Sequence, residues 1–179
     1  MHVSFTPLYE CPGGLIAGML AETYAALLRD LGERQAAELR SSWLEFDTAV
    51  QQGPYSVGAC GFVTRVEGNV VGFGSWDPRG WPEVGRVGHN CVRPAYQGHG
   101  YGSRQIEEIL RRFRAGGFAR AQARTGEHPF FAPARRMYLS CGFRAVGRQG
   151  DALMCGYGTV TYEIVLKEVE RPGRSVGAI

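Results

Sequence analysis

The sequence predicts a mixed α/β fold for this chain of 179 residues, and two patterns carry the prediction. Apolar residues recur every three or four positions over residues 14–31 and 33–51, which is the spacing of amphipathic helices. The segments that follow are short, apolar or alternating, and bounded by glycine and proline, as is typical of strands. A chain of this length fits one domain, so we expect one unit over residues 1–170 and a flexible tail over residues 171–179.

The remaining elements can be placed from the same patterns. Residues 3–8 are the candidate first strand, and residues 77–82, with two prolines and a glycine, are expected to form a loop. Residues 150–158 are expected to separate the last two strands. In chain order the other expected elements are strands at 61–66, 70–76 and 85–92, a helix at 102–115, a strand at 118–125, a helix at 133–140, and strands at 143–148 and 160–167.

A glycine-rich turn between a strand and a helix is the most informative segment. The strand ends at Cys91 and Val92 before Pro94, and glycines then stand at positions 98, 100 and 102. A helix N-terminus offers free backbone N–H groups and a positive dipole end to an anion, and glycine lets the backbone approach a phosphate closely. The even glycine spacing differs from the dinucleotide fingerprint Gly-x-Gly-x-x-Gly, and the segment lacks the Gly-Lys-Ser/Thr of a P-loop. The turn therefore predicts a phosphate site of another type.

Two motifs connect the chain to a known family. The pattern Gln-x-x-Gly-x-Gly at residues 97–102 resembles the pyrophosphate-binding motif of the GNAT superfamily of acyl-CoA-dependent N-acyltransferases. The pattern Ala-x-x-Met-Tyr-x-x-x-Gly-Phe at residues 134–143 resembles the second signature of that superfamily. The resemblance covers about residues 62–167 and implies the GNAT fold, a splayed, mostly antiparallel sheet flanked by helices.

The resemblance implies an N-acetyltransferase that moves an acetyl or other acyl group from acetyl-CoA to an amine by direct attack in a ternary complex. The acceptor is expected to be a small-molecule or peptide amine, with no metal, nucleic acid or membrane involved, and a homodimer is one option. The pantetheine arm would pair with the backbone where the fourth strand splays. The residues expected to bind acetyl-CoA are Cys91, Val92, Gln97, Gly98, His99, Gly100, Tyr101, Gly102 and Ser103.

The general base is the part of the site that the family pattern does not supply. An amine with a pKa of about 10 is protonated at neutral pH and must lose a proton before it attacks. The family usually places a glutamate on or before the fourth strand, but Arg86 stands at that position here. Glu83, just before this strand, and His89, on it, are the candidates that remain, and residues 127–128, Glu-His, are a further alternative.

Tyr138 matches the family tyrosine that protonates or hydrogen-bonds the leaving thiolate. The resemblance also implies that a backbone N–H near Val92 stabilises the oxyanion. Phe131 stands where the family usually has an asparagine, so a side-chain hydrogen bond to the pantetheine arm is not expected there.

A non-catalytic coenzyme A or acyl-CoA sensor with the GNAT fold is the alternative function. Tyr138 favours catalysis, whereas Arg86 in place of the glutamate favours the sensor. Release of free coenzyme A over a panel of amines would separate the two.

Composition excludes several other classes of protein. The net charge is only +3, and Arg111 and Arg112 each follow a glutamate by four residues, which gives little support to nucleic-acid binding. No apolar run approaches the roughly twenty residues of a membrane span, and the N-terminus shows no signal pattern. The five cysteines lack Cys-x-x-Cys spacing. We therefore expect a cytoplasmic protein with reduced thiols.

Overall fold

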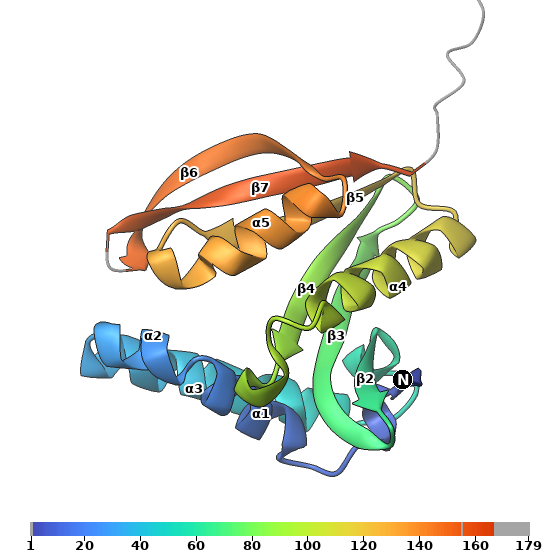
Figure 1. Ribbon diagram of the computed structural model, residues 1–179, viewed down its shortest axis with the longest axis horizontal. Helices are drawn as coiled ribbons and strands as arrows, with labels where there is room; N and C mark the ends of the chain where they lie inside the picture. Colours follow the sequence, from blue (N-terminus) through green and yellow to red (C-terminus); the bar gives the residue numbers. More distant parts are fainter. Residues whose placement is uncertain (1, 155, 167–179) are drawn as a thin grey trace, which may run out of the picture.

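A computed structural model describes residues 2–154 and 156–166, which form one seven-stranded sheet with helices against both faces (Figure 1). The strand order is β1-β2-β3-β4-β5-β7-β6, and every neighbouring pair is antiparallel except β4 and β5. The strands are β1 (Val3–Pro7), β2 (Gly61–Val66), β3 (Asn69–Gly80), β4 (Val84–Val92), β5 (Arg120–Gly126), β6 (Arg144–Met154) and β7 (Tyr157–Val165). The helices are α1 (Leu15–Thr23), α2 (Ala25–Asp30), α3 (Glu33–Val50), α4 (Tyr101–Ala115) and α5 (Ala132–Ser140). The predicted mixed α/β fold is confirmed.

The sheet splits between its two parallel strands. β4 pairs with β5 only from Val84 to Arg86, and the rest of β4 runs on to Val92 without β5 beside it. A β-bulge lies on this part of β4, because two residues, Gly88 and His89, stand opposite the single residue Ser75 of β3. The His89 N–H donates to Ser75 Oγ at 2.8 Å. Bulges bend a strand and increase its twist, which suits a strand that leaves its neighbour.

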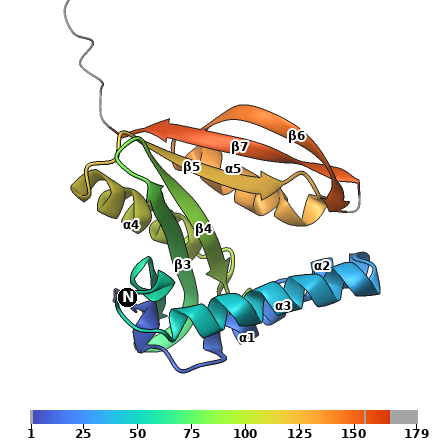
Figure 2. The same cartoon turned by 180° about the vertical axis from the view of Figure 1, so that it is seen from behind.

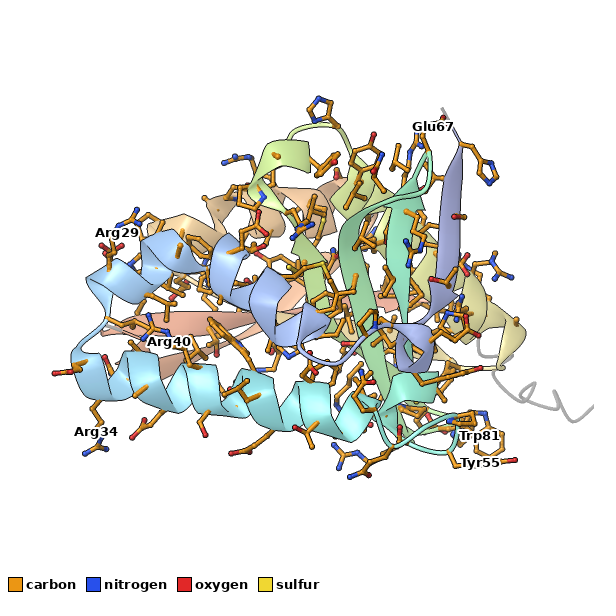
Figure 3. All side chains as sticks on the ribbon, turned by 90° about the horizontal axis from the view of Figure 1, so that it is seen from below. Arg29, Arg34, Arg40, Tyr55, Glu67 and Trp81 are labelled. Atoms are coloured by element: carbon orange, nitrogen blue, oxygen red, sulfur yellow. The ribbon has the colours of Figure 1, made fainter. Side chains whose placement is uncertain are left out.

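The two largest apolar clusters hold most of the helices to the sheet. One lies on the side of α4 and α5 and includes Phe62, Ile109 and Phe113. The other lies under α1 and α3, which cross the opposite face in Figures 2 and 3. On β5 the inward residues are alanines, and at Gly85 of β4 an added Cβ would lie 2.6 Å from the ring of Phe113. Small residues therefore let α4 pack closely where β4 and β5 are still paired.

Three element boundaries differ from the predictions. The helix expected over residues 14–31 is broken at Tyr24, which lies between α1 and α2. The Tyr24 ring packs on Trp43 of α3. The loop expected over residues 77–82 was wrong, because β3 continues to Gly80 through a register shift after Asp77. Such an irregularity tolerates a proline within a strand. The expectation that residues 150–158 separate the last two strands was also wrong, because β6 runs to Met154 and β7 begins at Tyr157.

Other expectations concern the surface and the chain ends. Glu108 accepts hydrogen bonds from both Arg111 and Arg112, with N–O distances of 2.7 Å to each Nε, instead of the expected pairing of Arg111 with Glu107. The tail predicted at residues 171–179 lies outside the described residues. Within the described ranges, no helix combines the length and apolar character needed to cross a membrane.

Candidate active site

Two adjoining cavities open where β4 leaves β5. We call them the larger cavity, of about 890 Å³, and the smaller cavity, of about 370 Å³. The smaller cavity lies at the glycine turn before α4, and the larger one lies among β3, β4, β5 and α5. Five residues line both cavities and so mark where they meet: Tyr24, Asn90, Phe131, Ala134 and Met137.

The glycine turn has the backbone conformation of an anion cradle. Gly98 and Gly100 both have a φ of 80°, a left-handed conformation that side chains with a Cβ rarely adopt. An added Cβ at either position would meet nothing within 4 Å, so the space in front of the backbone is open. Gly100 directly precedes the first turn of α4, and the first turn of an α-helix directs N–H groups without intrahelical partners outward. This geometry suits a phosphate group in the smaller cavity.

Most residues predicted to bind the cofactor lie around the smaller cavity. The seven that line it are Val92, Gln97, Gly98, Gly100, Tyr101, Gly102 and Ser103. Gln97 shapes the turn, since its Nε2 donates to the Val92 carbonyl at 2.9 Å. The side chains of Cys91 and His99 are elsewhere. The buried Cys91 thiol lies 3.2 Å from Thr23 Oγ1, and burial raises the pKa of this thiol to about 11. The His99 side chain is exposed, and its Nδ1 lies 2.9 Å from the Gln97 carbonyl oxygen.

The end of β4 presents backbone groups to the split in the sheet. The Arg93 N–H donates to the Val71 carbonyl of β3, whereas the Val92 carbonyl accepts from Gln97 and, at 3.4 Å, from Thr23 Oγ1. Because successive backbone groups of a strand point to opposite sides, the Val92 N–H faces away from β3 as well. It therefore faces the open side of β4, where Val92 lines the smaller cavity.

Tyr138 of α5 is buried in the wall of the larger cavity. Its side chain is 5% exposed, and its ring packs on Phe143 and stacks on Tyr162, with centroid distances of 5.5 and 5.7 Å. Burial, and then the nearby Tyr24, raise the pKa of the Tyr138 hydroxyl above its ordinary value of 10. The phenol therefore keeps its proton at neutral pH and can act as a hydrogen-bond donor.

Tyr24 is a functional candidate that the sequence did not reveal. The helical pattern assigned it to an ordinary core-facing stripe, yet it stands between α1 and α2 and lines both cavities. Burial raises the pKa of its hydroxyl too. Its ring is held by Trp43 and Phe130, with centroid distances of 5.4 and 5.2 Å. No local motif marks this position, because its neighbours come from α3 and from the segment before α5.

His89 is the candidate base that the structure brings to the larger cavity. Its ring lies against Phe46 and Phe73, with centroid distances of 4.9 and 6.0 Å. Burial lowers the pKa of this imidazole below its ordinary value of 6.5, because the charged form is poorly solvated there. The ring is therefore neutral at pH 7 and able to accept a proton.

The other candidate bases lie outside the residues that line the two cavities. Glu83 is exposed in the turn between β3 and β4, where its carbonyl accepts from the Arg120 N–H at the paired end of these strands. Glu127 pairs with Arg148 at 3.5 Å. His128 accepts the Phe130 N–H on Nδ1 at 3.1 Å and packs on Tyr157. The structure does not bring these three groups together with Tyr138.

Charged residues stand at the rim of the larger cavity. Asp77 and Arg79 form an ion pair at 2.7 Å, and hydrogen bonding to Arg79 lowers the Asp77 pKa to about 2. Arg124 of β5 lies in the same lining. Trp76 contributes to the cavity wall, but Trp81 is 65% exposed and stands at the edge of the molecule in Figure 3, where its Nε1 donates to the Gly116 carbonyl at 3.0 Å.

A comparison with known protein families gives the assignment that the fold and the site suggest. The family model described as the Acetyltransferase (GNAT) family matches residues 21–143, which is more than half of the chain. The chain therefore belongs to the GNAT acetyltransferase family, and the prediction drawn from the two motifs is confirmed.

Solved structures share the fold at low sequence identity. A protein from Desulfovibrio desulfuricans, assigned to the GNAT acetyltransferases, is 18% identical, with 93% of this chain and 100% of that chain covered and a TM-score of 0.71. The Salmonella typhimurium protein yncA, described as an acetyltransferase with its cofactor acetyl-CoA, is 18% identical, with 97% and 98% covered and a TM-score of 0.63. An N-acetyltransferase from Staphylococcus aureus Mu50 is 17% identical, with 93% and 100% covered and a TM-score of 0.61. Among curated proteins, none matches the chain significantly.

Proposed function

We propose that this protein is an N-acetyltransferase that transfers the acetyl group of acetyl-CoA directly to an amine while both are bound. The main support for this proposal is that the two cavities adjoin and share Tyr24, Asn90 and Met137 in their linings. One cavity has a phosphate cradle, and the other has a neutral imidazole and a protonated phenol in its wall. Direct transfer requires two binding sites that share a boundary, since the donor and acceptor atoms must come within about 3–3.5 Å of each other.

Acetyl-CoA fits the smaller cavity as the acyl donor. The open left-handed glycines at 98 and 100 and the N-terminus of α4 suit its pyrophosphate. The Val92 N–H faces the region where the thioester would lie. When bound, acetyl-CoA supplies a thioester carbonyl carbon that an amine can attack. Family membership and the relative described with acetyl-CoA support this assignment.

The larger cavity fits a small acceptor. Its volume of about 890 Å³ lies within the range of small-molecule sites, roughly 300–1,000 Å³. His89 Nδ1 or Nε2 takes the proton that the amine loses during attack, and the Tyr138 hydroxyl donates to the sulfur that departs. Glu83 has no role in this proposal, because it stands at the opposite end of β4 from the split.

The test of this function is acetyl transfer itself. We expect acetyl-CoA to raise the melting temperature of the protein. With a panel of primary amines, thiol release should match the amount of N-acetylated product measured by mass spectrometry. A protein indifferent to millimolar acetyl-CoA and coenzyme A would contradict the cofactor assignment. Binding without thiol release from any amine would contradict the transferase assignment.

The role of His89 predicts a particular pH dependence for His89→Gln. Below its lowered pKa the wild-type imidazole is protonated and cannot accept a proton, so the variant should differ little there. Near pH 10 a typical amine is already neutral, and the difference should shrink again. Between about pH 6.5 and 8.5 we expect kcat/KM to fall by roughly a hundredfold, a usual size for loss of a general base. The measurement is the pH profile of kcat/KM for both proteins.

His128→Gln is the matched control, because His128 is buried but lies outside the lining of both cavities. It should leave the shape of the pH profile unchanged. A His89→Gln profile parallel to that of the wild type at every pH would show that another group or water removes the proton.

A further inference from the structure

Arg124 gives the wall of the larger cavity a fixed positive charge. On β5 the side chains of Ala121 and Ala123 face the α4 and α5 side, and Arg124 lies on the opposite face. Its Nη2 donates to Gln149 Oε1 at 2.7 Å and to Thr159 Oγ1 at 3.1 Å, which come from β6 and β7. The guanidinium is thus held in place by strands that belong to the far half of the sheet.

Both hydrogen-bond partners of Arg124 are neutral. Among the described side chains, no carboxylate lies within 4.0 Å of it. Other arginines on the same half of the sheet do have acidic partners, as Arg120 has Glu163 at 3.7 Å and Arg148 has Glu127 at 3.5 Å. Arg124 therefore faces the cavity with hydrogen-bond donors, and none of the described acidic side chains pairs with its charge.

The rest of the cavity does not supply a counter-charge either. Asp77 is the acidic residue in the lining, and its carboxylate is already bound by Arg79. His89 is neutral at pH 7. The charged groups in the lining therefore sum to +1, from Arg79, Arg124 and Asp77. Much of the remaining wall is apolar, formed by Phe46, Val57, Trp76, Phe131 and Met137.

We propose that the acceptor is a small amine that also carries a carboxylate on an apolar skeleton, as an aromatic or aliphatic amino acid does, and that Arg124 binds the carboxylate. The inference rests on the proposed N-acetyltransferase function, since it names the class of acceptor. A planar guanidinium can bind a carboxylate through two parallel hydrogen bonds, which fixes the orientation of the ligand. The apolar side chain of the acceptor then packs on the aromatic wall, and the amine is left for His89.

The test compares amines that differ only in the carboxylate. The pairs are tryptophan with tryptamine, phenylalanine with phenethylamine, and leucine with isoamylamine. With the wild-type protein, kcat/KM should be higher for the acid-bearing member of the pair that fits the cavity best. Arg124→Gln should lower kcat/KM for that acid roughly ten- to a hundredfold, mainly through KM, because the contact binds ground state and transition state alike. The carboxylate-free partner should change little, and Arg124→Lys should retain part of the preference.

Arg120→Gln is the matched control, because Arg120 is on the same strand and face but outside the lining of the larger cavity. It should leave the preference within each pair unchanged. Equal or better turnover of the carboxylate-free member in every pair overturns the inference while the transferase function stands. A panel in which only other amines are acetylated has the same meaning. A panel in which no amine reacts although acetyl-CoA binds contradicts the proposed transferase function and, with it, this inference. Absence of acetyl-CoA binding would also count against the proposed function.

Discussion

Replacing Tyr138 with phenylalanine should reduce kcat by roughly ten- to a thousandfold while coenzyme A affinity changes little. The phenol is buried and keeps its proton, because burial raises its pKa. A thiol with a pKa near 8.5 departs as an anion, and a hydrogen bond from the phenol stabilises that anion more than the neutral thioester. Among the described residues, none hydrogen-bonds to the Tyr138 hydroxyl, so the substitution breaks no internal contact. Single-turnover rates and coenzyme A binding measure the two quantities.

Two other tyrosines make this test specific. Tyr162 is 4% exposed and stacks on Tyr138 but does not line the larger or the smaller cavity, so Tyr162→Phe should leave kcat nearly unchanged. Tyr24 lines both cavities, and its hydroxyl also keeps its proton at neutral pH. Comparing Tyr24→Phe with Tyr138→Phe therefore shows which phenol donates a hydrogen bond to the departing sulfur. A greater loss in Tyr24→Phe than in Tyr138→Phe would transfer the role to Tyr24. A Tyr138→Phe enzyme with wild-type chemistry would show that Tyr138 only packs.

Replacing Gly100 with glutamate should abolish acetyl-CoA binding. The new side chain would add a negative charge and bulk at the open cradle in front of α4. For the wild type, acetyl-CoA at a hundred times its Kd should stabilise the fold by about 2.7 kcal/mol. For a chain of this length that corresponds to a rise in melting temperature of about 5–11 °C. Thermal unfolding with and without acetyl-CoA should show this rise in the wild type and none in Gly100→Glu.

Gly68→Glu is the control that distinguishes loss of the acetyl-CoA site from the effect of backbone strain on stability. Gly68 is in the turn between β2 and β3, has a φ of 82° against 80° for Gly100, and likewise has nothing within 4 Å of an added Cβ. Both substitutions should therefore cost a similar amount of stability, roughly 1–2 kcal/mol for a left-handed residue with a Cβ. Only Gly100→Glu should lose the response to acetyl-CoA. Equal responses in the two variants would place the phosphates elsewhere.

The fold could be predicted where local sequence patterns determine an element. It was harder to predict where contacts between residues distant in the sequence determine the element. The pair of strands β2 and β3, together with β4, α4 and α5, follow from apolar spacing and from glycines near their ends. The break at Tyr24 was not predictable, because the apolar spacing continues through it and the ring is held by Trp43 of α3. The extension of β3 to Gly80 was missed for a related reason. Its prolines suggest a loop locally, but pairing with β4 resumes at Gly80 after a register shift.

The glycine turn before α4 and the family could both be identified from the residues alone. Left-handed glycines and a helix N-terminus lie within about ten residues of one another, so their function depends on local backbone conformation that the residue types impose. Which side chains share the larger cavity depends on contacts between elements that are distant in the sequence. His89 from β4, Arg124 from β5 and Tyr138 from α5 meet because the sheet splits after three paired positions, whereas Glu83 stays at the closed end. No spacing along the chain encodes that split, since it results from the bulge on β4 and from the packing of helices on the two diverging halves.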